Sequence, residues 1–278
     1  MTKIKIVTDS SAVISPERLS EIEINVVSLS VMIDGVIYAD KELDNVEFMS
    51  MMANAKSLPK TSQPPIGEFI ELYDKLGEDG SEIISIHLTE KLSGTVNTAR
   101  QAAQMSKSNV TVIDSDYIDQ ALGFQVYEAA KLAQSGASKD DVLQLVEDVK
   151  KRTSLYIGVA TLENLVKGGR VGKLVGALSG FLNMKIMMQL VNGELEVVGK
   201  GRGNKTFTKW LTALEKNLAH LDLEYIGISD ADSRELTTEL KNSLLTILPD
   251  FDIPIIHTIP LVATHAGKGA FAIMYYTK

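Results

Sequence analysis

Short, uninterrupted apolar runs alternate with helical patterns through the first half of the chain, and this alternation restricts the possible folds most. Strands with no polar alternation are buried on both faces, which is typical of a parallel sheet covered by helices. We therefore predict an α/β unit with a mostly parallel sheet. Its expected strands are 4–8, 25–33, 36–39, 82–88 and 110–113, with a turn at Asp34-Gly35, and its expected helices are 44–56, 66–76, 95–106 and 119–134.

The second half has a different pattern. Asn192-Gly193 lies between two strand-like runs and is a strong signal for a tight hairpin. A hairpin combined with crossover helices predicts a mixed sheet, and the length of 278 residues suits two domains. We expect an N-terminal domain over 1–152 and a C-terminal α/β domain over 153–278. The expected strands are 155–160, 185–191, 194–200, 225–229, 253–259 and 270–276, and the helices 138–151, 205–219 and 232–247.

Composition excludes several classes of function. The chain has no cysteine, so disulfides, thiol nucleophiles and zinc–thiolate centres are excluded. Four histidines without an H-E-x-x-H pattern argue against a metal-centred mechanism, and a net charge of −8 argues against nucleic acid or anionic membrane surfaces as partners. The most apolar region, 174–191, is interrupted by polar residues, so we expect no membrane span and a cytoplasmic protein.

Two hydroxyl-bearing segments stand at expected helix entrances. Thr89–Thr95, which contains Ser93 and Gly94, follows the strand at 82–88, and Thr61–Gly67, which contains Ser62, precedes the helix at 66–76. Ligands of open α/β sheets bind at the carboxyl ends of strands, and helix N-termini favour anions. Neither segment brings a catalytic base, so we expect an anion to be bound rather than transformed. The alternative is that the first segment is only a helix cap and that Pro65 only starts a helix.

Basic residues and a histidine occur in three glycine-rich segments. Arg170 lies in Gly168–Lys173 and Arg202 in Gly199–Lys205, and a planar guanidinium suits a carboxylate or a phosphate. Neither segment is a Walker A motif. His265, in a turn before the last strand, can donate a hydrogen bond to a ligand. The alternatives are ordinary surface arginines and a structural histidine.

Two aspartates leave a second class of function open. Asp9 and Asp114 end two expected strands at the same edge of the sheet, where such carboxylates either cap helices or bind metals in kinases and phosphatases. With Arg170 and Arg202 they motivate an alternative function, a phosphotransferase or hydrolase with its own active site.

The order and spacing of six short motifs resemble the DegV family, the fatty-acid-binding proteins that serve as the binding subunit of bacterial fatty acid kinase. The resemblance covers residues 3–277. It implies a two-domain α/β fold that holds one long-chain acyl group in a tunnel between or beneath the domains. The motifs are Val7-Thr8-Asp9-Ser10, Thr61-Ser62-Gln63-Pro64, Leu92-Ser93-Gly94-Thr95, Asp114-Ser115, Gly168-Gly169-Arg170-Val171 and His265-Ala266-Gly267.

The resemblance also implies roles for single residues. Thr61 and Ser93, with Ser62 and Gly94 beside them, match positions that bind the fatty-acid carboxylate, and His265 supports them. Arg170 and Arg202 look like the basic positions near the tunnel mouth, which dock the kinase subunit or stabilise the phosphate. A separate ATP-dependent kinase subunit then supplies the metal and the chemistry, so this chain needs no catalytic residue, metal or cofactor. The acyl phosphate enters phospholipid synthesis, with an acyltransferase as a downstream partner.

The sequence departs from the family pattern at two places. Glu90-Lys91 stands where the family usually has Ser-Gly, and we expect this departure to change the rim where the kinase docks. Met187-Met188 stands where the family usually has Lys-Pro, and we expect this departure to alter the tunnel wall. The apolar residues expected to shape that wall are Phe181, Leu182, Met184, Met187 and Met188, with ordinary core packing as the alternative. A lipid-sensing regulator remains a further alternative function.

Overall fold

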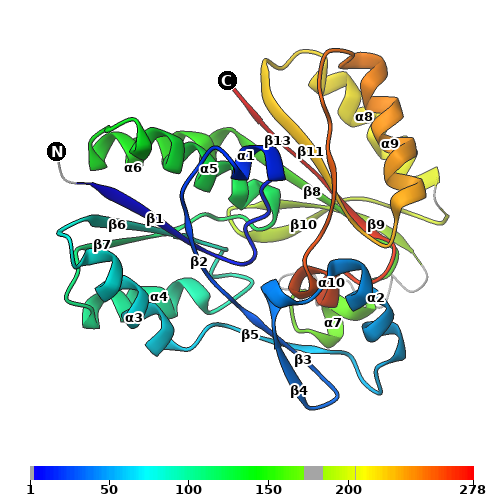
Figure 1. Ribbon diagram of the computed structural model, residues 1–278. Helices are drawn as coiled ribbons and strands as arrows, with labels where there is room; N and C mark the ends of the chain where they lie inside the picture. The colour runs from blue at the N-terminus through cyan, green and yellow to red at the C-terminus, as the bar shows by residue number, and fades with distance from the viewer. Residues whose placement is uncertain (1–2, 172–183, 204) are drawn as a thin grey trace.

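Three β-sheets organise the computed structural model, which describes residues 3–171, 184–203 and 205–278 (Figure 1). A parallel sheet has the order β2-β1-β6-β7, a mixed sheet β10-β9-β8-β13-β11-β12, and a small antiparallel sheet β4-β3-β5. The strands are β1 (Ile4–Asp9), β2 (Asn25–Val27), β3 (Ser30–Ile33), β4 (Val36–Ala39), β5 (Lys60–Ser62), β6 (Glu82–His87), β7 (Val110–Asp114), β8 (Thr153–Val159), β9 (Lys185–Val191), β10 (Glu194–Gly201), β11 (Leu223–Ala231), β12 (Ile255–His257) and β13 (Ala270–Thr277). This arrangement confirms the α/β class with a parallel and a mixed sheet.

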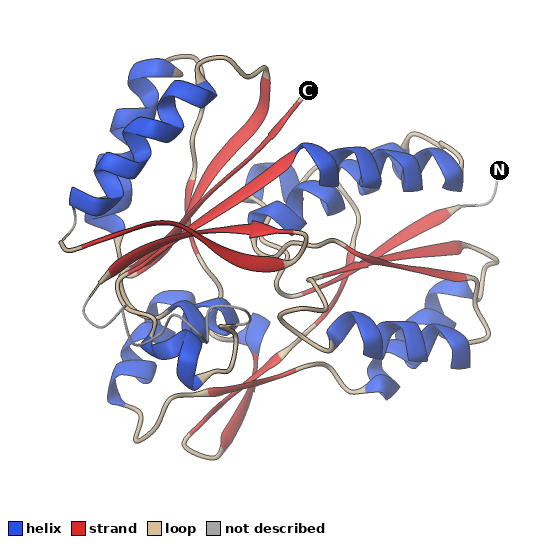
Figure 2. Ribbon diagram, turned by 180° about the vertical axis from the view of Figure 1, so that it is seen from behind, coloured by secondary structure: helices blue, strands red, loops and turns tan. Residues whose placement is uncertain are grey.

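Helices cover these sheets (Figure 2). Helices α3 and α4 pack on one face of the parallel sheet, while α5 lies against β1 and also reaches β8 and β13 of the mixed sheet. The helices are α1 (Pro16–Leu19), α2 (Asn45–Asn54), α3 (Ile66–Gly77), α4 (Thr95–Met105), α5 (Gln120–Gln134), α6 (Lys139–Arg152), α7 (Glu163–Lys167), α8 (Lys205–Leu218), α9 (Arg234–Ile247) and α10 (Pro260–Ala266), with a short 3-10 turn at Asp40–Glu42.

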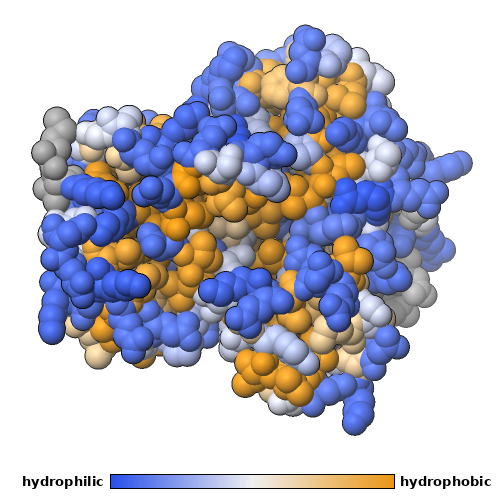
Figure 3. Space-filling view, viewed as in Figure 1, coloured by the Kyte–Doolittle hydropathy of each residue, from blue (hydrophilic) through white to orange (hydrophobic). Residues whose placement is uncertain are grey.

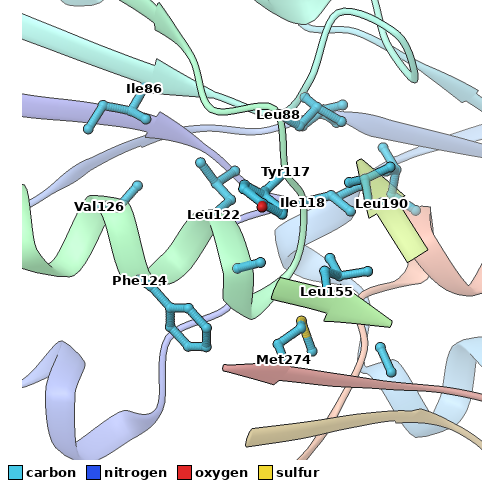
Figure 4. Close-up of a cluster of buried hydrophobic side chains, with 14 of the residues drawn as sticks. Ile86, Leu88, Tyr117, Ile118, Leu122, Phe124, Val126, Leu155, Leu190 and Met274 are labelled. Atoms are coloured by element: carbon cyan, nitrogen blue, oxygen red, sulfur yellow. The ribbon is translucent and has the colours of Figure 1, made fainter. Parts of the chain in front are cut away.

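One hydrophobic core runs through both halves of the chain. Figure 4 shows Leu122 and Val126 of α5 near Ile86 of β6, and Leu155 and Met274 of the mixed sheet on the other side of the helix. Because α5 is apolar nearly all round, it is buried between the two sheets rather than on a surface. We propose residue 152 as the boundary between two structural units, since β1–β7 make up the parallel and the small antiparallel sheets and β8–β13 make up the mixed sheet.

Local signals placed several elements correctly. Asp44 caps α2 by accepting hydrogen bonds from Val46 N and Glu47 N, and Ser138 forms a capping box with Asp141 at α6. The predicted hairpin joins β9 to β10, and Asn192 and Gly193 both have the positive φ that its tight turn requires.

The predicted strand 25–33 is wrong as a single element, because it divides into β2 and β3 in different sheets. The division falls at Leu29, whose N–H donates to Ser10 Oγ and whose carbonyl accepts from Asp40 N, so neither group is free for a sheet. The predicted strand 253–259 is also too long, since only Ile255–His257 pairs with β11. Strand β5 and helix α10 were not predicted at all.

The surface shows where apolar residues remain uncovered. Apolar side chains gather at the lower end of the view in Figure 3, over β4, where Val36 and Ile37 are 53% and 69% exposed. Among the helices that the structure describes, none combines the length and the apolar composition needed to cross a membrane.

Candidate ligand-binding site

A cavity of about 380 Å³ lies between the parallel and mixed sheets and against α10. Its walls are apolar, with Leu88, Ile118, Leu155, Val159, Leu195 and Leu261 among them. Six of the seven predicted site residues line it: Thr61, Ser62, Ser93, Gly94, Arg170 and His265. Arg202 is exposed in the turn after β10 and is not among the lining residues. An apolar cavity with a few converging polar groups is the usual form of a small-molecule site.

Thr61 and His265 meet at this cavity from distant parts of the chain. Thr61 lies on β5, where it pairs with Val31 of β3, and His265 lies in the last turn of α10. Thr61 Oγ1 is 2.9 Å from His265 Nε2, while His265 Nδ1 is buried and has no hydrogen-bond partner among the described residues. A buried N–H without an acceptor is rarer than a lone pair without a donor. We therefore place the proton on Nε2, so that it donates to Thr61 and leaves the Thr61 hydroxyl hydrogen free for a ligand.

The charge state of His265 follows from its surroundings. Burial, together with the nearby Arg170 charge, lowers the pKa of His265 to about 4. The ring is therefore neutral near pH 7, and Arg170 is the cation at this end of the cavity. Arg170 is held there by two carbonyls, since Nε donates to Leu92 O at 3.2 Å and Nη1 to Gly168 O at 2.6 Å.

This charge state predicts an unusual titration. The unfolded chain should protonate His265 near its ordinary pKa of 6.5, and the folded protein only near 4. The histidine therefore stabilises the fold above pH 6.5, and this contribution is lost as the pH falls towards 4. An NMR titration, with the ring signal assigned from a His265→Gln variant, should show no protonation of His265 near pH 6.5. A midpoint there would contradict the buried, neutral ring.

Gly168 allows the close packing of this histidine. A Cβ atom at position 168 would lie 2.3 Å from His265 Nδ1, far closer than such contacts occur. A glycine is needed at this point because any side chain would displace the ring from Thr61.

Ser93 lies at the entrance of α4, as the sequence suggests. Its Oγ accepts from Thr95 N at 3.3 Å and lies 2.9 Å from Thr95 Oγ1. Gly94 is the N-cap residue of α4 and makes no side-chain bond, and Ser93 accepts from the first helical N–H, that of Thr95, from the position before the cap. When Thr95 is the donor in the contact between the two hydroxyls, the Ser93 hydroxyl hydrogen can donate to a ligand.

Gln63 was quoted in a motif but given no role by the sequence. Its Nε2 donates to Thr98 Oγ1 at 2.6 Å. A Cβ atom added at position 94 would lie only 2.1 Å from Gln63 Oε1. Gln63 therefore ties β5 to the start of α4 and lies across Gly94. Close approach of two chain segments explains the glycine, and only the fold brings these segments together.

Helix α10 is anchored at its start by a buried carboxyl group. Asp40 Oδ1 accepts from Leu261 N at 2.9 Å, and Asp40 is 2% exposed. Burial raises the pKa of Asp40 to about 6, although the bonds from Leu261 and Ser10 oppose this shift. The helix that carries His265 is thus capped by a group that titrates near neutral pH.

The raised pKa of Asp40 predicts a measurable pH dependence. The unfolded chain should bind this proton near pH 3.8 and the folded protein near pH 6, so the folded state is relatively favoured as the pH falls through this window. Above pH 6 the buried anion destabilises the fold by about 3 kcal/mol, since each pKa unit is about 1.4 kcal/mol. The Asp40→Asn variant keeps an acceptor for Leu261 N and should unfold at higher urea above pH 6. Its advantage should vanish towards pH 4, and an advantage that does not change with pH would contradict this origin.

The aspartates behind the alternative function do not reach the cavity. Asp9 is fully buried, where its carboxylate accepts from Leu88 N and Ser11 and lies 2.9 Å from His87 Nδ1. Asp114 accepts from Glu90 N and Asp116 N. Neither lines the cavity, and the part of the chain that the structure describes holds no cluster of three histidine or acidic side chains suited to a metal.

The residues expected to shape the tunnel wall divide between several places. Met188 lines the cavity, whereas Met187 points to the opposite face of β9 and packs in a second core, as strand alternation requires. Met184 packs against the main core without lining the cavity. Phe181 and Leu182 lie outside the described residues. At the rim, Glu90 pairs with Arg100 at 2.8 Å.

Comparison with known proteins gives a consistent result. A family model described as "Uncharacterised protein, DegV family" matches residues 3–278. The chain is 49% identical over 275 residues to the DegV domain-containing protein spr1019 of Streptococcus pneumoniae, covering 99% of this chain and 98% of that one. Among solved structures, a fatty acid binding DegV family protein from Thermus thermophilus superposes with a TM-score of 0.89 at 29% identity, and DegV of Bacillus subtilis, a fatty acid binding protein, with 0.90 at 29%. Both superpositions cover 100% of each chain. The chain therefore belongs to the DegV family.

Proposed function

We propose that this protein binds one long-chain fatty acid, with the acyl chain in the apolar cavity and the carboxylate at Thr61, Ser93 and Arg170. The observation that carries the proposal is an apolar cavity lined at one end by the Thr61 and Ser93 hydroxyls and the Arg170 guanidinium. Each buried CH₂ group contributes about 0.8 kcal/mol, so a long chain supplies most of the affinity. The fatty acid binding of the two solved relatives supports the same ligand.

The carboxylate is held by donors that need no proton transfer. Neutral His265 orients the Thr61 hydroxyl, the N-terminus of α4 adds a favourable dipole beside Ser93, and Arg170 supplies the charge. Ser62 and Gly94 complete this end of the cavity. The arrangement binds an anion, and binding a carboxylate that is already ionised needs no base.

We further propose that the protein acts in the cytoplasm and presents this carboxylate to a separate ATP-dependent kinase. The kinase forms an acyl phosphate, and an acyltransferase of phospholipid synthesis consumes it. Arg202 is exposed and well placed to meet a partner protein, and the Glu90-Lys91 rim is a further part of that surface. The presenting role is the one that the family resemblance implies for a carboxylate held by hydroxyls and an arginine at one end of the cavity.

Native mass spectrometry of protein purified from a heterologous host tests the binding. A co-purified fatty acid is expected, and an empty protein that also fails to bind added palmitate would refute the proposal. Acyl-phosphate formation with and without a fatty acid kinase subunit tests the presentation. We expect product only with both proteins, and ATP turnover by this chain alone would favour the phosphotransferase alternative.

A further inference from the structure

The two hydroxyls at the carboxylate end of the cavity come from different layers of the fold. Thr61 lies on β5, which pairs with β3 of the small antiparallel sheet, whereas Ser93 lies just before α4, which follows β6 of the parallel sheet (Figure 1). Hydrogen bonds weaken steeply when their distance and angle are wrong, so a carboxylate that accepts from both hydroxyls needs a fixed spacing between them. The relative position of β5 and α4 is therefore part of the site.

The Gln63 side chain connects these two elements. Gln63 follows Thr61 by two residues, and its Nε2 donates to Thr98 Oγ1, in the first turn of α4, at 2.6 Å. Thr98 Oγ1 in turn donates to Gly94 O at 3.3 Å, so this hydroxyl both accepts and donates. The bond therefore joins the end of β5 to the residue that follows Ser93.

The same side chain also lies against the backbone at Gly94. A Cβ atom there would be 2.1 Å from Gln63 Oε1 and 3.1 Å from its Cδ, so the two segments are in close contact. Gln63 and Gly94 both line the cavity, whereas Thr98 is 8% exposed and does not line it. An effect of Thr98 on a ligand must therefore pass through other residues.

We propose that Gln63, held by Thr98, is a positioning residue for the carboxylate site. It sets the spacing of the Thr61 and Ser93 hydroxyls, and with it the preference for a carboxylate over a neutral head group. The proposal rests on the fatty-acid binding proposed above.

Two measured quantities separate this role from a general structural one. A carboxylate can accept from Thr61 and Ser93 with different oxygens, whereas an alcohol of the same chain has a single neutral oxygen. The affinity ratio of acid to alcohol therefore reports on the head-group contacts. The gain per added CH₂ group, about fourfold, reports on the apolar walls. A loss of spacing should lower the ratio and leave the gain unchanged, while damage to the cavity should change both.

Calorimetric titration of delipidated protein with decanoate, dodecanoate and dodecan-1-ol measures both quantities. Gln63→Met keeps the length of the side chain but loses its amide, so the ratio of acid to alcohol should fall about threefold to tenfold. Thr98→Val removes the acceptor of the Gln63 bond and should have the same effect. Thr98→Ser keeps the hydroxyl and should restore the ratio. The gain per CH₂ group should stay constant throughout.

Gln134→Met is the matched control. Gln134 also ties two segments together, since its Oε1 accepts from Glu23 N at 2.8 Å and its Nε2 donates to Glu21 O at 3.2 Å. It does not line the cavity. The same substitution at this position should leave both quantities as in the parent protein.

Several outcomes would overturn the positioning role. An unchanged ratio in Gln63→Met and Thr98→Val would do so, and so would an equal loss for acid and alcohol. A fall in Gln63→Met alone would mean that the amide contacts the head group directly. If Gln63→Met does not fold, the comparison of Thr98→Val with Thr98→Ser decides, because a low ratio in the first and a restored one in the second supports the proposal.

The parent protein distinguishes this failure from a failure of the proposed function. If neither acid nor alcohol binds to it, the fatty-acid proposal fails and the positioning role fails with it. If the parent prefers the acid and the variants keep that preference, only the positioning role is overturned.

Discussion

Replacing Ser93 with alanine is expected to weaken palmitate binding by about tenfold to a hundredfold. The change removes one hydrogen bond to a charged group, which contributes roughly 1.5–3 kcal/mol. The Thr61→Val variant should have a similar effect, since His265 already occupies the hydroxyl oxygen and leaves only its hydrogen for the ligand. Calorimetric titration of the delipidated variants measures both effects, and kinase-coupled turnover should fall in parallel.

The matched control is Ser135→Ala, at the exposed end of α5, which should bind as the parent protein does. Because the hydrogen bond from Thr95 N to Ser93 Oγ contributes only about 1 kcal/mol, the Ser93→Ala protein should remain folded at ordinary temperature. Parent-like affinity in both Ser93→Ala and Thr61→Val would remove these residues from the carboxylate site. A loss of affinity that follows a loss of folding would also speak against a direct role.

The largest effect on stability is expected from Gly123→Ala. Gly123 lies in α5, and a Cβ there would be 2.1 Å from the carbonyl oxygen of Val13. That oxygen is backbone, and the segment around it is tied to the start of α5, with Val13 N bonded to Asp119 O and Asp119 N to Ser11 O. Neither partner can withdraw without loss of these bonds, so a destabilisation of about 3 kcal/mol follows. Urea unfolding measures it.

Gly67→Ala is the control, because Gly67 is also helical and a Cβ there meets nothing within 4 Å. It should stabilise the protein by about 0.4–1 kcal/mol, through the lower entropy of the unfolded chain. If both variants changed stability alike, the close approach of α5 to the Val13 segment would be wrong.

Sequence patterns were sufficient where the deciding contacts are local. The Asp44 and Ser138 caps and the Asn192-Gly193 turn are each determined by a few neighbouring residues, and the apolar runs of β1 and β6 reveal a parallel sheet without further information. The position of Ser93 at the entrance of α4 belongs to the same class, because strand, glycine and helix follow one another directly.

Elements whose partners are distant in the sequence were missed. Thr61 was placed in a loop, yet it lies on β5, whose pairing with β3 depends on the division of 25–33 at Leu29. Helix α10 was missed because it is short and its cap, Asp40, is more than two hundred residues away in the chain. Asp119 was identified only as the start of a helix, since Ser229 and Thr258 reach it through the second half of the fold.

Helix α10 makes the chain intolerant of a change in length between 258 and 265. Its start is fixed by Asp40 on Leu261 N, and its end is fixed by His265 on Thr61. One inserted or deleted residue would rotate His265 about the helix axis by about 100° relative to Leu261, because an α-helix has 3.6 residues per turn. Relatives that keep both contacts should therefore show substitutions within this stretch but no gaps.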